Sequence, residues 1–295
     1  MRRFYLENEY GDRVGLNNET GIFLTEPSGL GLEFSDSFVD IGEGFFKLTK
    51  KGHQQKTISC KINFVGANPY TDYNKFITWC MKSKELYLVY GVPIFNNTEQ
   101  EIQYYIHVEI ANIQKGEINL AGYLEAPANF LYLSPWYLPT PVNPVNTGLI
   151  DEAFRFNLKR FDVAPLAPLQ IKDYEAIIEP QGHLPAAFEV EYTGVIRDPV
   201  IKLVGVTGKE YGRCEITQIV NVSTTKIILS TKYDNPFVKM VTDKGVETNL
   251  LPKVNLIHNP FFKMPVNEKC RLTVEDSGSM TGKLNIKVFY YFRSV

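Results

Sequence analysis

The side chains most often used as metal ligands and general bases are few in this sequence. It has four histidines, His53, His107, His183 and His258. None stands in an H-E-x-x-H or H-x-H setting, which is the spacing expected of a metal site. A histidine in a strand or turn without such spacing is more often a surface residue. We therefore expect no metal site and no histidine base.

The nucleophiles also lack catalytic spacing. No G-x-S-x-G elbow is present, and the glycine-rich stretches lack the closing Gly-Lys-Ser/Thr of a phosphate-binding loop. The cysteines are scattered without a C-x-x-C pair, at Cys60, Cys80, Cys214 and Cys270. In a reducing compartment they are expected to be buried thiols without disulfides. We expect no catalytic residues, no cofactor-binding residues and no cofactor.

Paired carboxylates are the remaining route to catalysis, because glycosidases of all-β fold use them. Glu189 and Glu191 lie two residues apart and share one face of an expected strand. The other face of this strand is apolar, so both carboxylates are expected to face water. Glu99 and Glu101 are expected to flank a loop, and Asp276 to lie in a hairpin turn over residues 275–282. An all-β glycosidase, with Glu189 and Glu191 as its acid–base pair, is our third hypothesis.

The elements that would position these side chains are mostly strands. Apolar and polar residues alternate with a period of two in several runs separated by Gly, Asn and Asp, the pattern of sheets with one buried face. The apolar sets of three runs are Ile58, Cys60, Ile62 and Phe64; Tyr104, Ile106, Val108 and Ile110; and Leu284, Ile286, Val288, Tyr290 and Phe292. This pattern predicts β-sandwiches.

One segment has helical spacing instead. Between residues 68 and 84 the apolar side chains form a helical stripe, at Tyr70, Tyr73, Phe76, Ile77, Cys80 and Met81. Asn68 is expected to cap this helix, with Pro69 in its first position and basic residues in its last turn. The first half of the chain is thus predicted to be a β-sandwich with one packed helix.

Prolines gather between residues 126 and 168. Because proline lacks an N–H, such density disfavours central strands and long helices. We expect a first domain over residues 1–127, a Pro-rich connection over residues 128–170, and a second β-sandwich over residues 171–295. Only residues 147–161 in the connection could form a short helix.

The composition excludes several classes of protein. The chain of 295 residues is 44% hydrophobic and 22% charged, which is typical of a globular protein. Its net charge of −2 and its lack of a basic stripe argue against nucleic-acid recognition. The N-terminal residues are polar and do not resemble a signal peptide, and no apolar run is long enough for a membrane span. We expect a protein made in a cytoplasm, with no membrane insertion.

Sugar binding is a second hypothesis, because carbohydrate-binding β-sandwiches stack sugars on exposed aromatic rings. The chain is rich in Phe and Tyr, but its two tryptophans, Trp79 and Trp136, lie in the expected helix and the Pro-rich connection. Packing in a core or an interface is the simpler role for both.

Several local strings resemble the distal tail proteins of long-tailed phages of Gram-positive hosts and of related tail-like bacteriocins. In the first half these are Phe4-Tyr5-Leu6, Gly11, the P-x-G-L-G turn of residues 27–31, the helix with the strand of residues 86–90, and the S-P-W string of residues 134–136. In the second half they are residues 179–190, Thr193-Gly194, residues 198–201 and the closing residues 287–295.

This resemblance implies a first domain that closes into a homo-hexameric ring and a second domain with a galectin-like, jelly-roll-type β-sandwich. It implies a non-enzymatic hub at the virion tail tip. The implied partners are the tail tube protein and a tail-associated lysin, fibre or receptor-binding protein. No binding residue is transferred by the resemblance. The alternative is a carbohydrate-binding module that docks on host cell-wall polysaccharide.

Limited proteolysis of the isolated chain should cut first between residues 126 and 168. The halves on either side should resist, because each would bury its own alternating strands. Ring formation should stay with the first half, and the second half alone should be monomeric. Mass spectrometry of the early fragments checks this, and an early cut inside either half would contradict it.

Overall fold

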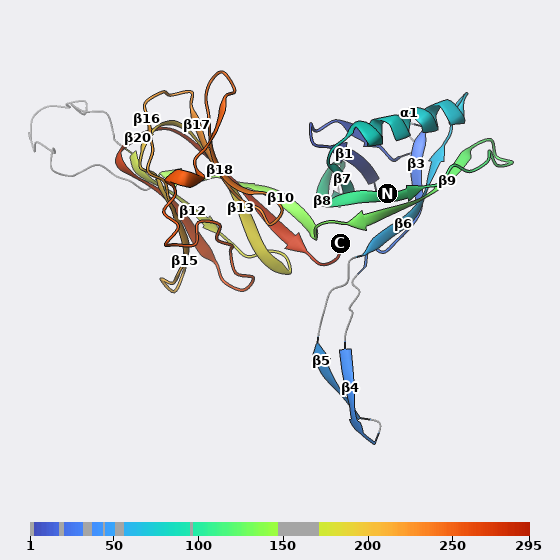
Figure 1. The fold of residues 1–295 in the computed structure, drawn as a ribbon, viewed down its shortest axis with the longest axis horizontal. Coiled ribbons are helices and arrows are strands. Elements are labelled where there is room, and N and C mark those ends of the chain that lie inside the picture. Colours follow the sequence, from blue (N-terminus) through green and yellow to red (C-terminus); the bar gives the residue numbers. More distant parts are fainter. Residues whose placement is uncertain are drawn as a thin grey trace, which may run out of the picture. The chain divides into compact units, whose positions relative to one another are not determined.

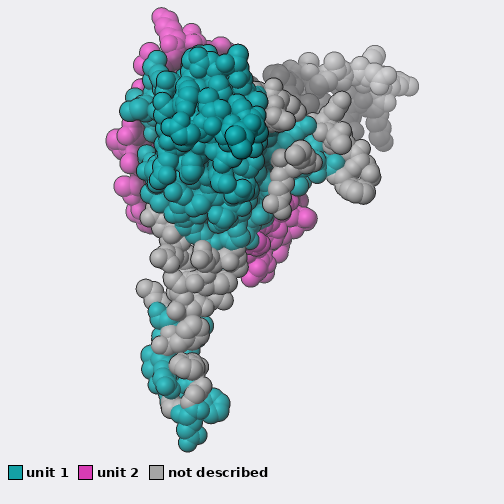
Figure 2. Space-filling view, turned by 90° about the vertical axis from the view of Figure 1, so that its right-hand side faces the viewer, with its two compact units in different colours: residues 1–138, 292–295 teal, residues 139–291 magenta. Residues whose placement is uncertain are grey.

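The structure, a computed structural model, describes residues 3–17, 21–31, 37–43, 45–50, 56–94, 97–146 and 171–295. The chain forms two compact units, one of Met1–Leu138 with Phe292–Val295 and one of Pro139–Tyr291 (Figure 2). Both are built from strands, and the described residues hold one α-helix (Figure 1). The predicted mainly-β class with two β-sandwich units is confirmed.

The first unit is an antiparallel sheet that curls back on itself. Its strands run in the order β2 (Arg13–Gly15), β1 (Arg3–Asn8), β7 (Leu86–Ile94), β8 (Asn97–Ile113), β9 (Leu124–Tyr132), β6 (Thr57–Phe64) and β3 (Ile22–Ser28). The two ends of this series meet, because Leu24 N donates to Leu16 O at 3.1 Å. The sheet therefore has two facing walls with a core between them.

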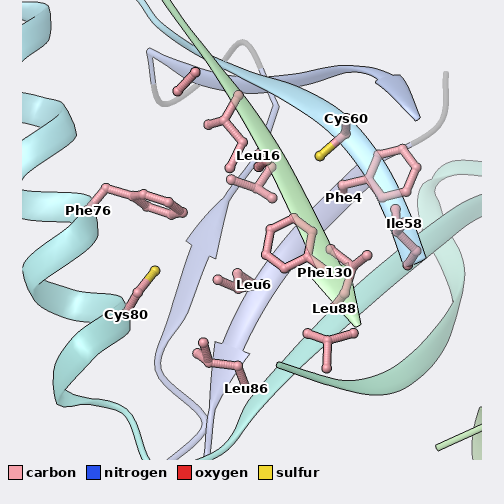
Figure 3. Close-up of a cluster of buried hydrophobic side chains, with 14 of the residues drawn as sticks. Phe4, Leu6, Leu16, Ile58, Cys60, Phe76, Cys80, Leu86, Leu88 and Phe130 are labelled. Carbon is pink, nitrogen blue, oxygen red and sulfur yellow. The ribbon is translucent and has the colours of Figure 1, made fainter. Parts of the chain in front are cut away.

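The alternating residues identified in the sequence fill this core. Ile58, Ile62 and Phe64 of β6 are wholly buried, as are Leu88 of β7 and Phe130 of β9. Figure 3 shows these strands directing their apolar side chains toward Phe76 and Cys80 of the helix. Burial of such side chains contributes about 1.5–3 kcal/mol each, which makes the core the main source of stability.

The helix α1 (Pro69–Lys82) forms as its sequence predicts. The Asn68 side chain caps it by accepting from Thr71 N at 3.2 Å, and Pro69 occupies the first turn. Its buried stripe packs on the sheet, where the rings of Phe64 and Phe76 meet edge to face at 5.7 Å. The helix is therefore held by its cap and by one apolar face.

The P-x-G-L-G turn has a steric reason for its central glycine. Gly29 has a φ of +84°, and a Cβ there would lie 2.2 Å from Thr57 O. Its carbonyl accepts from the Tyr132 hydroxyl at 2.8 Å. Only glycine allows this close approach of two backbones.

A separate hairpin joins β4 (Ser37–Gly42) to β5 (Phe45–Lys50) as a two-stranded sheet. Its register shifts twice, and Glu43 in the turn has a φ of +52°. Four large apolar side chains of the hairpin are exposed, namely Val39, Ile41, Phe45 and Leu48.

The Pro-rich segment differs from its prediction. Its first part forms β9, a central strand between β6 and β8, followed by β10 (Trp136–Val142) and β11 (Val145–Asn146). Pro127 is accommodated because its carbonyl accepts from Gln114 N, beyond the last β8 pair. A residue's N–H and C=O point to the same side of a strand, so the missing N–H falls where the ladder has ended. The expected boundary at residue 127 lies inside β9, and residues 147–170 lie outside the described residues.

The second unit is a sandwich of two antiparallel sheets. One has the order β11, β12 (Ile171–Ile178), β20 (Cys270–Phe292), β14 (Val200–Gly205) and β15 (Glu210–Glu215). The other has the order β20, β13 (Leu184–Arg197), β17 (Lys226–Thr231), β18 (Pro236–Val241) and β19 (Glu247–Asn249). The short β16 (Ile219–Val220) pairs with the end of β13, and Leu251–Lys253 form a 3-10 turn.

Strand β20 belongs to both of these sheets. Its first part pairs with β12 and β14, and its later part pairs with β13 from Thr281 to Tyr291. The predicted hairpin turn over residues 275–282 is therefore wrong. The Gly and Ser residues there let the strand pass from one sheet to the other without reversing.

The residues after β20's last β13 pair join the first unit. The rings of Phe292 and Tyr104 pack at right angles with centroids 5.4 Å apart, and Val295 also packs against the first core. The apolar face expected to stay within the second sandwich, which included Phe292, is thus divided between the two units.

Replacing Phe292 with Ala should destabilise the first unit by about 1–3 kcal/mol, from lost burial and the lost ring pair. Trp79 and Trp136 both lie in this unit, so tryptophan fluorescence in urea reports on it. Leu120→Ala is the control, because that side chain is fully exposed. An unchanged midpoint for Phe292→Ala would show that the first unit does not need these residues.

Candidate functional site

The histidines are separate from one another. The His107 ring stacks on Tyr87 at 5.0 Å. His183 N donates to Tyr291 O, and His258 Nε2 lies 4.0 Å from Glu215 Oε1. His53 lies outside the described residues. No group of metal-ligand side chains occurs in the parts of the chain that the structure describes.

Four carboxylates considered for acid–base chemistry lie beside basic or amide groups, and the side chain of the fifth, Glu99, is outside the described part of the structure. Glu189 lies 3.9 Å from Lys232 Nζ, and Glu191 lies 3.2 Å from Lys226 Nζ. Glu101 lies within β8 and not beside a loop, because β7 and β8 continue pairing up to it. Asp276 accepts from Arg197 N at 2.9 Å.

The cysteines are all free and buried, as predicted. Burial raises the pKa of the Cys60, Cys80 and Cys214 thiols to about 12. It raises the pKa of Cys270 to about 11. These groups therefore remain protonated thiols at neutral pH, a state that is neither nucleophilic nor ligating.

An organised group of polar and aromatic side chains covers the outer face of β1, β2, β7, β8 and β10. We call it the tyrosine–arginine face, defined by Tyr5, Arg13, Tyr87, Tyr105, His107 and Tyr137. Cross-strand register builds it in rows, because residues directly opposite share a face. One row runs through Tyr5, Val89 and Tyr105, and Tyr137 continues it with its ring stacked on Tyr105 at 5.7 Å.

Arg13 ties the rows of this face together. Its guanidinium carbon lies 5.6 Å from the Tyr5 ring centre and 5.8 Å from that of Tyr105. Its Nε donates to Glu7 at 2.5 Å, and its Nη2 donates to Gln103 and to the Tyr105 hydroxyl at 3.0 and 2.7 Å. Burial opposes the charge of Arg13, but these hydrogen bonds outweigh it and raise its pKa. Hydrogen bonds and ring contacts therefore link the side chains of this face to one another.

Two small positions allow this packing. Val89 is wholly buried although it lies on the outer side of the sheet, since Tyr5 and Tyr105 flank it. At Gly91 a Cβ would lie 2.5 Å from the Glu101 carboxylate, so glycine leaves room for that group. This face could not be predicted from the sequence, because its residues meet only through strand register. The signal was the row of Tyr, Arg and Glu at the polar positions of the strands.

A groove lies between the other side of the first unit's sheet and its helix. It has a volume of about 410 Å³, and its lining residues include Ile77, Met81, Ile110 and Ile113. Polar and apolar atoms both contribute to its exposed surface. Lys84 and Glu109 are its charged lining residues. We call it the helix groove.

Within the described residues, no helix is long and apolar enough to cross a membrane.

Trp136 takes the structural role expected for it. It is wholly buried in the first core, and its Nε1 donates to the Tyr132 hydroxyl at 3.1 Å. The S-P-W string therefore anchors the end of the first unit.

A family model for the N-terminal domain of distal tail proteins matches residues 3–133. Residues 3–133 are therefore an N-terminal domain of the distal tail protein family. The match covers the helix groove and all strands of the tyrosine–arginine face except β10, and it confirms the resemblance seen in the sequence. Membership indicates a structural protein of a phage tail.

Solved structures share the fold of this chain over all or nearly all of its length. A chain of the phage P2 baseplate in its activated conformation with Ca is 14% identical with a TM-score of 0.70, and each chain is covered completely. The same values hold for the phage P2 baseplate structure with Sr. The SPP1 Dit protein, described as a hub of the adsorption apparatus of Gram-positive infecting phages, is 9% identical with a TM-score of 0.53 over 97% of both chains. A search of curated proteins found no match.

The thiols should be unreactive in the native protein. At pH 8 a disulfide reagent such as Ellman's reagent should modify none of the four cysteines quickly, and all four in denaturant. Each thiol has a higher pKa in the folded protein than in the unfolded chain. The thiols therefore add to the free energy of unfolding below about pH 8.5, and this stabilisation is lost as the pH rises through their folded pKa values. Fast native reaction of any thiol would contradict its burial.

Proposed function

We propose that this chain is a non-enzymatic hub at the virion tail tip. Six copies close into a ring that joins the tail tube to a tail-associated lysin, fibre or receptor-binding protein. The family match over residues 3–133 is the observation that carries the proposal. The first unit is the ring-forming part, and the second unit holds the parts of the tip.

The character of the surfaces supports an assembly role. Tyr and Arg are the side chains most often found at the energetic centre of protein interfaces, and the tyrosine–arginine face presents both on a rigid sheet. Glu189, Glu191 and Asp276, which were considered for catalysis, are engaged with basic or amide groups. Such surfaces suit stable contacts with protein partners.

The alternative, a carbohydrate-binding module, finds less support. Tyr233 is the large aromatic side chain that the described part of the second unit exposes, at 53%. Lys263 Nζ lies 4.2 Å from the centre of its ring. One face of this ring is therefore in contact with the Lys263 ammonium, and a sugar stacking on that face would have to displace it. Titration of the full chain with host wall polysaccharide tests this alternative, which predicts saturable heat.

The full chain should form particles of about six times its 33.7 kDa mass. Light scattering coupled to chromatography measures the mass, and negative-stain electron microscopy shows whether the particles are rings. Arg13→Ala should leave a folded chain with a locally loosened tyrosine–arginine face, so it reports whether that face takes part in assembly. A strict monomer at high concentration, with no ring in any assembled particle, would sink the hub proposal.

A further inference from the structure

The β4–β5 hairpin exposes more apolar surface than a two-stranded sheet can hold stably in water. Val39, Ile41, Phe45 and Leu48 are 51%, 64%, 66% and 46% exposed. An isolated two-stranded hairpin is marginal at best in water, and exposed apolar clusters mark interaction sites. The hairpin therefore requires a surface to pack on.

The charge of the hairpin tip indicates which kind of surface it would pack on. Asp40 and Glu43 flank Ile41, and the first basic side chain after the turn is Lys47 in β5. The tip is thus apolar and acidic. It should prefer an apolar site with basic side chains at its edge.

The helix groove of the first unit has this character. Most of its lining residues are apolar, polar atoms share its exposed surface, and Met81 in the lining is 83% exposed. Lys84 lines the groove and Lys82 ends the adjoining helix. Glu109 is the acidic lining residue and lies on the β8 side. The basic side chains come from the end of α1, so an acidic tip has one favourable orientation.

We propose that the tip of the β4–β5 hairpin of one copy enters the helix groove of the next copy. This inference rests on the proposed ring and names its contact. The two surfaces differ from each other, so the contact is head-to-tail, and a head-to-tail contact repeated with a closing rotation produces a ring.

Cysteine cross-linking tests the contact. Ile41→Cys places a thiol on the tip and Met81→Cys places one on the groove rim, both at exposed positions. The native thiols are buried and do not compete. When the two single variants are mixed and oxidised, a cross-linked pair containing one chain of each should form. Ile41→Cys mixed with Leu120→Cys, an exposed loop position, is the matched control.

Each outcome decides the matter. Rings without an Ile41→Cys to Met81→Cys cross-link overturn this contact but leave the ring standing. A cross-linked pair without rings supports the contact and overturns the ring. Monomers without any cross-link overturn both. A cross-link within single chains of the Ile41→Cys/Met81→Cys double variant, and none between chains, places the hairpin on its own groove and overturns the proposal.

A charge exchange gives a second measurement on the full chain. Glu43→Lys and Lys84→Glu should each weaken association by roughly twofold to fivefold per contact, the range for a surface ion pair. Their combination should recover most of the loss, whereas Asp243→Lys in the second unit should change nothing. Single variants without effect, or a double variant weaker than both singles, would contradict the predicted orientation.

Discussion

The hydrogen bonds of β20 are the constraint on which both units depend. Every backbone N–H and C=O of a buried strand needs a partner, and this strand is 23 residues long. It finds partners first on β12 and β14 and then on β13, so one strand holds the two sheets of the second sandwich together. The chain then continues directly to Phe292, which packs in the first unit. A change in β20 register would move every one of these contacts.

The surfaces of the first unit fall into two kinds. The tyrosine–arginine face is internally satisfied, because Arg13 has hydrogen-bonding partners on β1 and β8 and Tyr105 stacks on Tyr137. The hairpin and the helix groove differ from this face, because both leave large apolar side chains in contact with water. A face whose side chains already bind one another gains little from a partner. A surface with exposed apolar side chains gains free energy when a partner buries them.

Local signals in the sequence were sufficient for the elements whose stability is local. Helix α1 could be predicted with its cap, because Asn68, Pro69 and the apolar stripe act within a few residues of one another. The burial of the cysteines and of Trp136 followed from their chemistry. Proline was harder, since its cost depends on which neighbour its missing N–H faces. At Pro127 that side is the end of a ladder, and only the fold reveals this.

The tyrosine–arginine face could not be predicted for a related reason. Tyr5, Arg13, Tyr105 and Tyr137 come from four strands, and only their register brings the rings together. The Gly- and Ser-containing segment at residues 276–282 has the composition of a turn, but tertiary pairing with β12 and β13 keeps it extended.

The packing of residues 292–295 in the first unit also affects the order in which that unit can complete its core during synthesis. During synthesis the strands and helix of residues 3–138 emerge early, but the core they form lacks Phe292 and Val295 until almost the whole of the second sandwich has been made. Residues 3–138 therefore keep part of their apolar surface exposed until residues 292–295 have been synthesised. A chain broken off before residue 292 would leave that surface exposed to water, and exposed apolar surface of this kind favours aggregation.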